Sequence, residues 1–220
     1  MNIVTYHHTT ETIDAVVNGQ DINPRDSVLS ICGSGDTTFA MAEIAQEVLS
    51  IDRSLAQVEY AKSRKKLIEA DDFDGFLKAL VNKDFIWAFD RRNSYFLEEE
   101  RLQRIAEKVK AGKVSFEHRD FFEIASQNPG RFTKVYASCV FGNSGIHPKF
   151  YHVRLQDLSA SLVIGGLIYL ADSNDMNIRA QRKGLKVVIP EVLQMDGELT
   201  DVARAYEHQT WKPVVYRKIG

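Results

Sequence analysis

A glycine pair and a later carboxylate have the residue types and spacing of a nucleoside-binding site. Gly33-Ser34-Gly35 follows the strand-like run 27–31 (SVLSI) and precedes a helical pattern of apolar residues. Glycine allows the backbone to approach a ligand closely and to adopt positive φ at such a turn. Asp52 stands nineteen residues after Gly33, at the end of a second strand, where a carboxylate can accept hydrogen bonds from both ribose hydroxyls. Together these motifs predict a strand-helix-strand unit that binds a nucleoside.

Asp36 and Thr38 indicate which nucleoside cofactor fits this turn. A dinucleotide-binding turn has Gly or Ala three residues after its second glycine, and Thr38 occupies that place. Asp36 puts a negative charge where a pyrophosphate would approach the helix, whereas a ligand with an ammonium group tolerates it. S-adenosylmethionine has such a group. The alternative is that Asp36 only caps the helix.

The run 28–57 (VLSICGSGDTTFAMAEIAQEVLSIDRSLAQ) resembles the opening of class I S-adenosylmethionine-dependent transferases. It aligns without a gap to a narrower group, the S-adenosylmethionine:diacylglycerol 3-amino-3-carboxypropyl transferase-like family. Tyr6 and Glu11 match that family's upstream Tyr and Glu at the same mutual spacing, so the resemblance covers residues 6 to 80. We assign cofactor binding to these matched positions and their neighbours: Tyr6, Glu11, Cys32, Gly33, Ser34, Gly35, Asp36, Asp52, Arg53 and Gln57.

Two later strand ends are expected to reach the same pocket. Asp120 and Phe121 follow the strand at 114–118 and resemble the adenine-contacting pair of class I transferases, a carboxylate for the exocyclic amine and an aromatic ring for the adenine face. The alternative for Asp120 is an ordinary surface carboxylate. Ser138 follows the strand at 132–137, where such enzymes present the sulfonium to the acceptor, and we expect it to contact the cofactor.

Three residues are candidates for catalysis: Tyr6, Asn143 and His147. Asn143 lies in the loop 138–145, whose small residues permit close approach of an acceptor. His147 is the candidate general base, because a histidine near its unperturbed pKa can take a proton from a hydroxyl or an amine. The alternative is that His147 only begins the helix that starts near Pro148.

The remaining pattern alternates short apolar runs with helical segments and predicts a single α/β domain over residues 1–220 with a Rossmann-like class I methyltransferase fold. Its sheet is expected to be seven-stranded and mostly parallel, with an antiparallel edge and a helical layer inserted at about 69–112. Helices are expected at 55–68 and 147–161. The expected strands are 27–31, 47–51, 114–118, 132–137, 162–171, 186–189 and 213–218.

The composition indicates which classes of partner and which cellular compartment to expect. The 28 basic and 30 acidic residues give a net charge of −2, so we expect no nucleic-acid partner and a small-molecule or lipid-like acceptor instead. The longest apolar run, 162–171, is too short to span a membrane. Two cysteines and the absence of a leader pattern predict a cytoplasmic protein. We expect no metal site, because the pair His7-His8 has no third ligand at a recognisable spacing.

The predicted reaction is an S-adenosylmethionine-dependent displacement, with methyl transfer as the first expectation because it is the commoner chemistry of the fold. Transfer of the 3-amino-3-carboxypropyl group is the alternative, since the sequence does not determine which carbon faces the acceptor. An NAD(P)-binding oxidoreductase and a non-catalytic S-adenosylmethionine-binding module also remain open. The oligomeric state is not indicated by the sequence.

Overall fold

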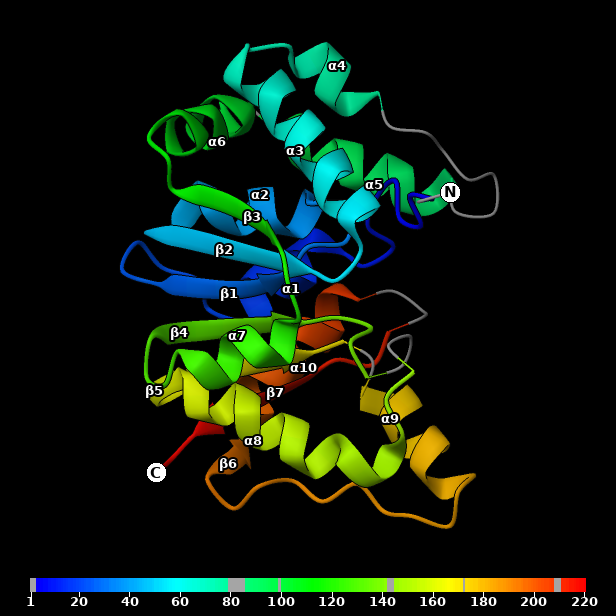
Figure 1. Ribbon diagram of the computed structural model, residues 1–220. Helices are drawn as coiled ribbons and strands as arrows, with labels where there is room; N and C mark the ends of the chain where they lie inside the picture. The colour runs from blue at the N-terminus through cyan, green and yellow to red at the C-terminus, as the bar shows by residue number, and fades with distance from the viewer. Residues whose placement is uncertain (1–2, 79–85, 99, 142–144, 172, 208–210) are drawn as a thin grey trace.

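A computed structural model describes residues 3–78, 86–98, 100–141, 145–171, 173–207 and 211–220. Its centre is a seven-stranded sheet with the strand order β3-β2-β1-β4-β5-β7-β6 (Figure 1). The strands are β1 (Ser27–Ile31), β2 (Glu47–Asp52), β3 (Val114–His118), β4 (Phe132–Ala137), β5 (Leu162–Leu170), β6 (Leu193–Met195) and β7 (Val214–Lys218). Strands β1 to β5 pair in parallel, and β7 runs antiparallel to both β5 and β6. The predicted mostly parallel sheet with an antiparallel edge is therefore confirmed.

The order of the strands determines where a ligand can bind. The chain builds outward from β1 to β2 and β3, then returns to place β4 and β5 on the other side of β1. At such a reversal the connections that follow β1 and β4 leave in opposite directions and open a crevice at the carboxyl ends of the strands. The segments after β1, β2, β3 and β4 all begin at this edge.

Helices cover both faces of the sheet, because successive strand side chains point to opposite sides. Val28 and Tyr136 belong to one core cluster, and their chain neighbours Leu29 and Val135 belong to the other. The first cluster includes residues of α1, α2, α3 and α10, and the second includes residues of α7, α8 and α9. The helices are α1 (Ile13–Gly19), α2 (Asp36–Ile44), α3 (Leu55–Glu69), α4 (Phe73–Leu77), α5 (Ile86–Phe96), α6 (Arg101–Lys110), α7 (Phe121–Gln127), the 3-10 turn η2 (Pro148–Phe150), α8 (Tyr151–Ser161), α9 (Ser173–Gln181) and α10 (Gly197–Tyr206).

The predicted helical insertion is confirmed as α4, α5 and α6, which gather with α3 above β1, β2 and β3 in Figure 1. Its aromatic residues extend the first core cluster. Phe76 makes edge-to-face contacts with Phe39 of α2 and Phe96 of α5, at centroid distances of 5.5 and 5.1 Å. These contacts attach the insertion to α2, whose first residues form part of the glycine turn.

The expected strand at 186–189 is wrong. Residues 185–190 have no regular structure, and the edge strand is β6 at Leu193–Met195. Val187 and Ile189 pack against the second core cluster, while Val188 is exposed and its carbonyl oxygen lies 3.1 Å from Nδ1 of His152. The alternating pattern is therefore satisfied by a segment that packs on α8 without pairing in the sheet.

Four of the described helices lie at positions where no helix is predicted from the sequence: α1, α7, α9 and α10. Helix α10 separates the last two strands, β6 and β7. No described helix is both long enough and apolar enough to cross a membrane.

Candidate active site

A cleft of about 1000 Å³ opens at the carboxyl edge of the parallel strands. It is lined by the segments after β1, β2, β3 and β4 and by seven consecutive residues, 5–11, which we call the N-terminal strap. Ten of the predicted site residues meet there: Tyr6, Glu11, Cys32, Gly33, Ser34, Asp52, Arg53, Asp120, Phe121 and Ser138. The structure brings these residues, which span 132 positions of the sequence, together in one cleft, and their roles in cofactor binding stay predictions.

The two glycines of the turn have different roles. Gly35 has φ +85°, and a Cβ there would lie 3.1 Å from the ring of Phe39 and 3.3 Å from Ala61, so it faces the core. Gly33 has φ +50°, and a Cβ there would meet no atom within 4 Å. Gly35 thus allows α2 and α3 to pack closely, whereas Gly33 leaves open space at the cleft wall that a ligand can fill.

Asp52 ends β2 and faces the cleft. Its Oδ1 accepts from the Ser54 amide at 2.9 Å and its Oδ2 from the Gly33 amide at 3.3 Å, so it joins the two motifs found in the sequence. Burial raises the pKa of the Asp52 carboxyl group above its ordinary value, although the two amide hydrogen bonds oppose the shift. The carboxylate retains acceptor capacity towards the cleft, as ribose recognition requires.

Asp120 caps α7 and also lines the cleft. Its Oδ1 accepts from the amides of Phe122 and Glu123 at 2.9 and 3.0 Å, a capping role that the sequence did not indicate. Both bonds fall on the same oxygen, and the side chain is exposed. Phe121 beside it is buried and contributes to the same wall. Capping and ligand contact are therefore compatible at Asp120.

Asp36 does not face the cleft, and the expectation that it meets an ammonium group of the ligand is corrected by the structure. Its side chain is fully buried and absent from the cleft lining. Oδ1 lies 2.7 Å from Nη2 of Arg64 and 2.8 Å from Nε of Arg92, and Oδ2 accepts from the Ser34 hydroxyl and the Thr9 amide, each at 2.8 Å. Burial alone would raise the pKa of Asp36, but the two guanidinium groups outweigh it and hold the pKa well below its usual range. Asp36 supports the turn from behind.

Gln57 also lies outside the cleft lining, and it binds protein instead of ligand. Its Oε1 accepts from the amides of Thr5 and Tyr6, each at 3.1 Å, and its Nε2 donates to the Tyr6 carbonyl oxygen at 2.6 Å. The side chain is 2% exposed. Its contact with the cleft therefore runs through the main chain of the strap.

The rest of the strap is held in the same way along its length. Tyr60 donates to the His7 carbonyl at 2.8 Å, and Trp211 donates from Nε1 to the Thr10 carbonyl at 3.3 Å. Ser138 donates from its hydroxyl to Glu11 Oε1, so the last strap residue meets the end of β4.

Burial raises the pKa of Tyr136 well above its ordinary value, and the charge of Glu11 adds to this shift. Glu11, Ser138 and Tyr136 form one polar group in the cleft wall.

His147 does not reach the cleft, which corrects its expected role as general base. It is exposed and precedes η2, where its Nδ1 accepts from the Lys149 amide at 3.3 Å. This is the helix-start role that the sequence left as the alternative. Asn143, the other loop candidate, lies outside the described residues. Gly35, Asp36, Gln57 and His147 are thus the described candidates that do not line the cleft.

Several cleft residues were not singled out from the sequence. They include Phe122, Tyr136, Arg154 and Trp211. Only Tyr136 had a usable signal, because it stands next to the last residue of a strand whose carboxyl end was already assigned to the pocket. The guanidinium of Arg154 lies 5.1 Å from the ring centroid of Phe122, a contact between two segments that no local pattern connects.

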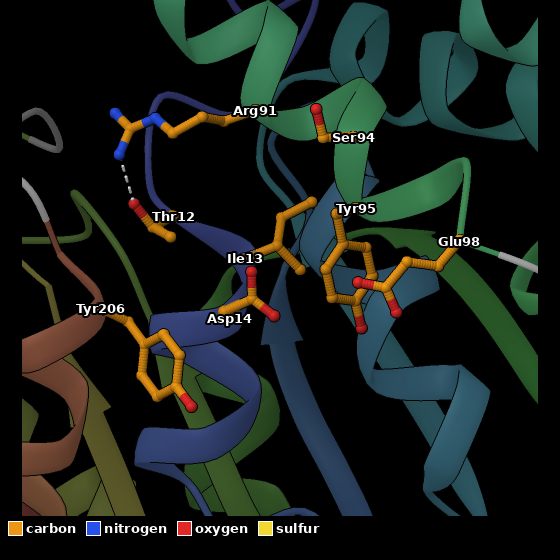
Figure 2. A pocket seen from close by; sticks show the side chains of 8 residues that line it. All are labelled: Thr12, Ile13, Asp14, Arg91, Ser94, Tyr95, Glu98 and Tyr206. Atoms are coloured by element: carbon orange, nitrogen blue, oxygen red, sulfur yellow. Dashed lines mark hydrogen bonds between the residues drawn. The ribbon is translucent and has the colours of Figure 1, made fainter.

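A smaller pocket of about 200 Å³ begins where the strap joins α1 (Figure 2). Arg91 of α5 points across its rim and donates from Nη1 to Oγ1 of Thr12 at 2.8 Å. Below this bond, Asp14 and Glu98 present carboxylates, and burial raises the pKa of Asp14 despite the opposing charge of Arg101. The Arg91 bond fixes the residue that follows the strap.

Among the described residues, no three His, Cys, Asp or Glu side chains gather as metal ligands.

The strand order and the antiparallel β7 are those of the class I S-adenosylmethionine-dependent methyltransferase fold. Solved structures of methyltransferases share this fold. The N-methyltransferase NodS from Bradyrhizobium japonicum, solved with S-adenosyl-L-homocysteine, is 11% identical, with a TM-score of 0.52 over 93% of this chain and 83% of that one. TrmN from Thermus thermophilus is 15% identical, with a TM-score of 0.55 over 94% of this chain and 48% of that one. The tRNA methyltransferase TrmI from Aquifex aeolicus is 14% identical, with a TM-score of 0.50 over 94% of this chain and 69% of that one.

No model of a known protein family matches the sequence, and no curated protein matches it either. The structural similarity corrects one expectation. From the sequence alone, the net charge of −2 excludes a nucleic-acid partner, yet a tRNA methyltransferase has this same fold. The exclusion is wrong because recognition of nucleic acid depends on the local surface near a site, which overall charge does not describe.

Proposed function

We propose that the protein binds S-adenosylmethionine in the cleft and transfers its methyl group to an acceptor. The observation that carries this proposal is the meeting of Gly33, Asp52 and the pair Asp120-Phe121 at the carboxyl edge of a sheet with the class I methyltransferase fold. The open space at Gly33 and the buried, partly bonded carboxylate of Asp52 fit a nucleoside. Structures with this fold, NodS among them, bind S-adenosyl-L-homocysteine.

The proposed roles follow from the position of each residue in the cleft. Asp52 accepts hydrogen bonds from the ribose hydroxyls, with Arg53 beside it, while Asp120 and Phe121 hold the adenine. Cys32, Gly33 and Ser34 form the turn under the ligand. Tyr6, Glu11 and Ser138 lie in the remaining wall, where the strap meets the end of β4. Tyr6 is placed there as the candidate catalytic residue.

When bound, S-adenosylmethionine supplies a carbon already activated by its positively charged leaving group. The chain therefore has to align the acceptor and remove its proton. Glu11 is the described carboxylate of the cleft that is not assigned to adenosine. We propose that Glu11 accepts the proton of the acceptor hydroxyl or amine. It thereby takes the role of general base that was expected for His147.

Transfer of the 3-amino-3-carboxypropyl group is the second candidate, and one observation favours it. Tyr6 and Glu11, the upstream residues that match the aminocarboxypropyl transferase-like family, both line the cleft together with the glycine turn. The two reactions leave different by-products. Methyl transfer leaves S-adenosylhomocysteine, and aminocarboxypropyl transfer leaves methylthioadenosine.

Parallel calorimetric titrations with S-adenosylmethionine, S-adenosylhomocysteine, methylthioadenosine and NAD test the cofactor. We expect micromolar binding, about −8 kcal/mol, of the first two ligands and none of NAD. Binding of NAD alone would restore the oxidoreductase alternative. Binding of none of the four by folded protein would overturn the proposal.

Incubation with S-adenosylmethionine and fractionated small molecules, lipids or RNA then tests the reaction. The by-product identifies the transferred group before the acceptor is known, because it comes from the cofactor alone. We expect S-adenosylhomocysteine to accumulate in one acceptor fraction. Cofactor binding without either by-product in any fraction would favour the non-catalytic module.

A further inference from the structure

We propose that Gln57 is a positioning residue for the cofactor, which it serves by holding the N-terminal strap closed over the cleft. This inference rests on the proposed function. The strap forms one wall of the cleft with seven consecutive residues, and Tyr6, the residue that Gln57 binds, is one of them. A side chain that fixes the main chain of Tyr6 therefore fixes a group that faces the ligand.

The contact has the geometry of a specific clamp. The amide group of Gln57 is a paired acceptor and donor, and the main chain of Tyr6 offers the matching donor and acceptor, with N···O distances of 3.1 and 2.6 Å. The Thr5 amide shares Oε1 at 3.1 Å. Gln57 is 2% exposed, so loss of the pairing would leave buried polar atoms unsatisfied.

The clamp is the first of three contacts from one face of α3. Gln57, Tyr60 and Arg64 are spaced three and four residues apart and so lie along one side of the helix. Tyr60 binds the His7 carbonyl at 2.8 Å, and Arg64 pairs with Asp36, which accepts from the Thr9 amide at 2.8 Å. Gln57 and Tyr60 bind main-chain atoms of the strap directly, and Arg64 reaches the Thr9 amide through Asp36. Its path is thereby fixed by α3 while its side chains line the cleft.

The test compares Gln57→Ala and Gln57→Glu with the wild type and with Glu59→Gln as a matched control. Glu59 is on the same helix, its side chain is 61% exposed, and within the described residues its ion pair is with Lys62. The probe is S-adenosylhomocysteine, with affinity by calorimetry and dissociation rate by stopped flow. We expect Gln57→Ala to bind about tenfold more weakly or worse and to release the probe faster, while Glu59→Gln matches the wild type.

The pH dependence of Gln57→Glu separates a clamp from simple loss of packing. The introduced carboxylate can accept from the two amides but cannot donate to the Tyr6 carbonyl oxygen, so two oxygens oppose each other at high pH. Protonation restores one donor and one acceptor. We expect the affinity of this variant, divided by that of the wild type at each pH, to recover between pH 8 and pH 5.5, and Gln57→Ala to show no recovery.

Each outcome has a defined meaning. Equal affinity and equal dissociation rate for wild type and Gln57→Ala would overturn the role of Gln57 while leaving the proposed function intact. Absence of probe binding by the wild type would overturn both. If Gln57→Ala does not fold, Tyr60→Phe removes the next contact from the same face, and unchanged probe release in that variant would also count against the clamp.

Discussion

The guanidinium groups of Arg64 and Arg92 approach the same carboxylate oxygen, Oδ1 of Asp36, at 2.7 and 2.8 Å. The three residues are between 0 and 3% exposed, so two positive charges and one negative charge are buried together. The ring of Phe76 lies against both arginines, with its centroid 4.3 Å from Cζ of Arg64 and 4.9 Å from that of Arg92. This cluster joins the glycine turn, α3 and the inserted helices behind the cleft.

Removal of the Asp36 charge should therefore destabilise the protein strongly. In Asp36→Asn two buried guanidinium groups lose their counter-ion, and we expect the free energy of unfolding to fall by about 3–5 kcal/mol. Urea denaturation measures this. Asp71→Asn is the control, because its pair with Lys110 is about half exposed and should cost less than about 1 kcal/mol. Equal losses in the two variants would contradict the structural role of Asp36.

The same cluster predicts a difference between wild type and Asp36→Asn in acid. The pKa of Asp36 in the folded state is held below its value in the unfolded chain by the two arginines. Its contribution to stability is then complete above about pH 4 and is lost as the pH falls through the folded-state pKa. We expect the stability difference between the two proteins to shrink below pH 4 in denaturation curves. A difference that stays constant down to pH 2 would argue against this coupling.

Asp52→Asn should separate binding from stability. The pKa of Asp52 is raised by burial, so the charged form costs stability at neutral pH and the stability of the wild type should increase as the pH falls through that pKa. We expect the variant to melt at the same or a higher temperature and to bind S-adenosylhomocysteine about 100-fold more weakly, because charge-assisted bonds to the ribose are lost. Wild-type affinity should also decline as the pH falls through the raised pKa of Asp52, and that of the variant should not. Full affinity in Asp52→Asn would refute the ribose assignment.

Gly33→Ala and Gly35→Ala should fail in different assays. At Gly35 a methyl group combines positive φ with contacts of 3.1 and 3.3 Å to Phe39 and Ala61, and we expect a loss of about 1–3 kcal/mol in unfolding free energy. At Gly33, with φ +50°, the methyl group meets no protein atom, so only the strain of positive φ, about 1 kcal/mol, opposes it; the protein should fold but bind S-adenosylhomocysteine less tightly. Denaturation and calorimetry on both variants check this, and a reversed pattern would show that the two glycines have been assigned to the wrong sides of the turn.

His147→Ala should leave cofactor binding and transfer unchanged. The side chain is exposed, lies outside the cleft lining and makes one long bond of 3.3 Å at the start of η2. We expect a change in unfolding free energy within about 0.5 kcal/mol. Glu11→Gln is the informative comparison, because it should lower the yield of by-product in the transfer assay. Loss of by-product in His147→Ala alone would return the general base to His147.

The parts of the site that the sequence predicted well are local. Gly33 and Asp52 belong to one strand-helix-strand unit, and the amide of Gly33 bonds directly to Asp52 across two neighbouring strands. Their relation follows from a single repeat of secondary structure. Asp120 and Ser138 also line the cleft, as expected from the sequence. They follow parallel strands, whose carboxyl ends meet at one edge of the sheet.

The roles of Asp36 and Gln57 depend on contacts that local patterns do not contain. Gln57 meets Tyr6 across 51 positions, and Asp36 meets Arg92 across 56. One signal was present: Arg64 falls on the apolar face of α3 with Val58, Ala61 and Ile68, which indicates a buried arginine that requires a buried carboxylate. Without this signal, the position of Asp36 beside the glycine turn favours contact with the ligand, and the structure shows the buried pairing instead.

The wall made by the strap has a consequence for how the protein folds. Its anchors are drawn from almost the whole chain, and the bond from Trp211 to Thr10 spans 201 positions. Contacts of such separation carry a large loop-closure cost and form late, after elements with short-range contacts such as the β1-α2-β2 unit. The sheet can therefore assemble before the strap completes the wall of the cleft. During refolding, the sheet would form before the fluorescence of Trp211 reaches its native value. The capacity to retain a ligand would be the last native property to return.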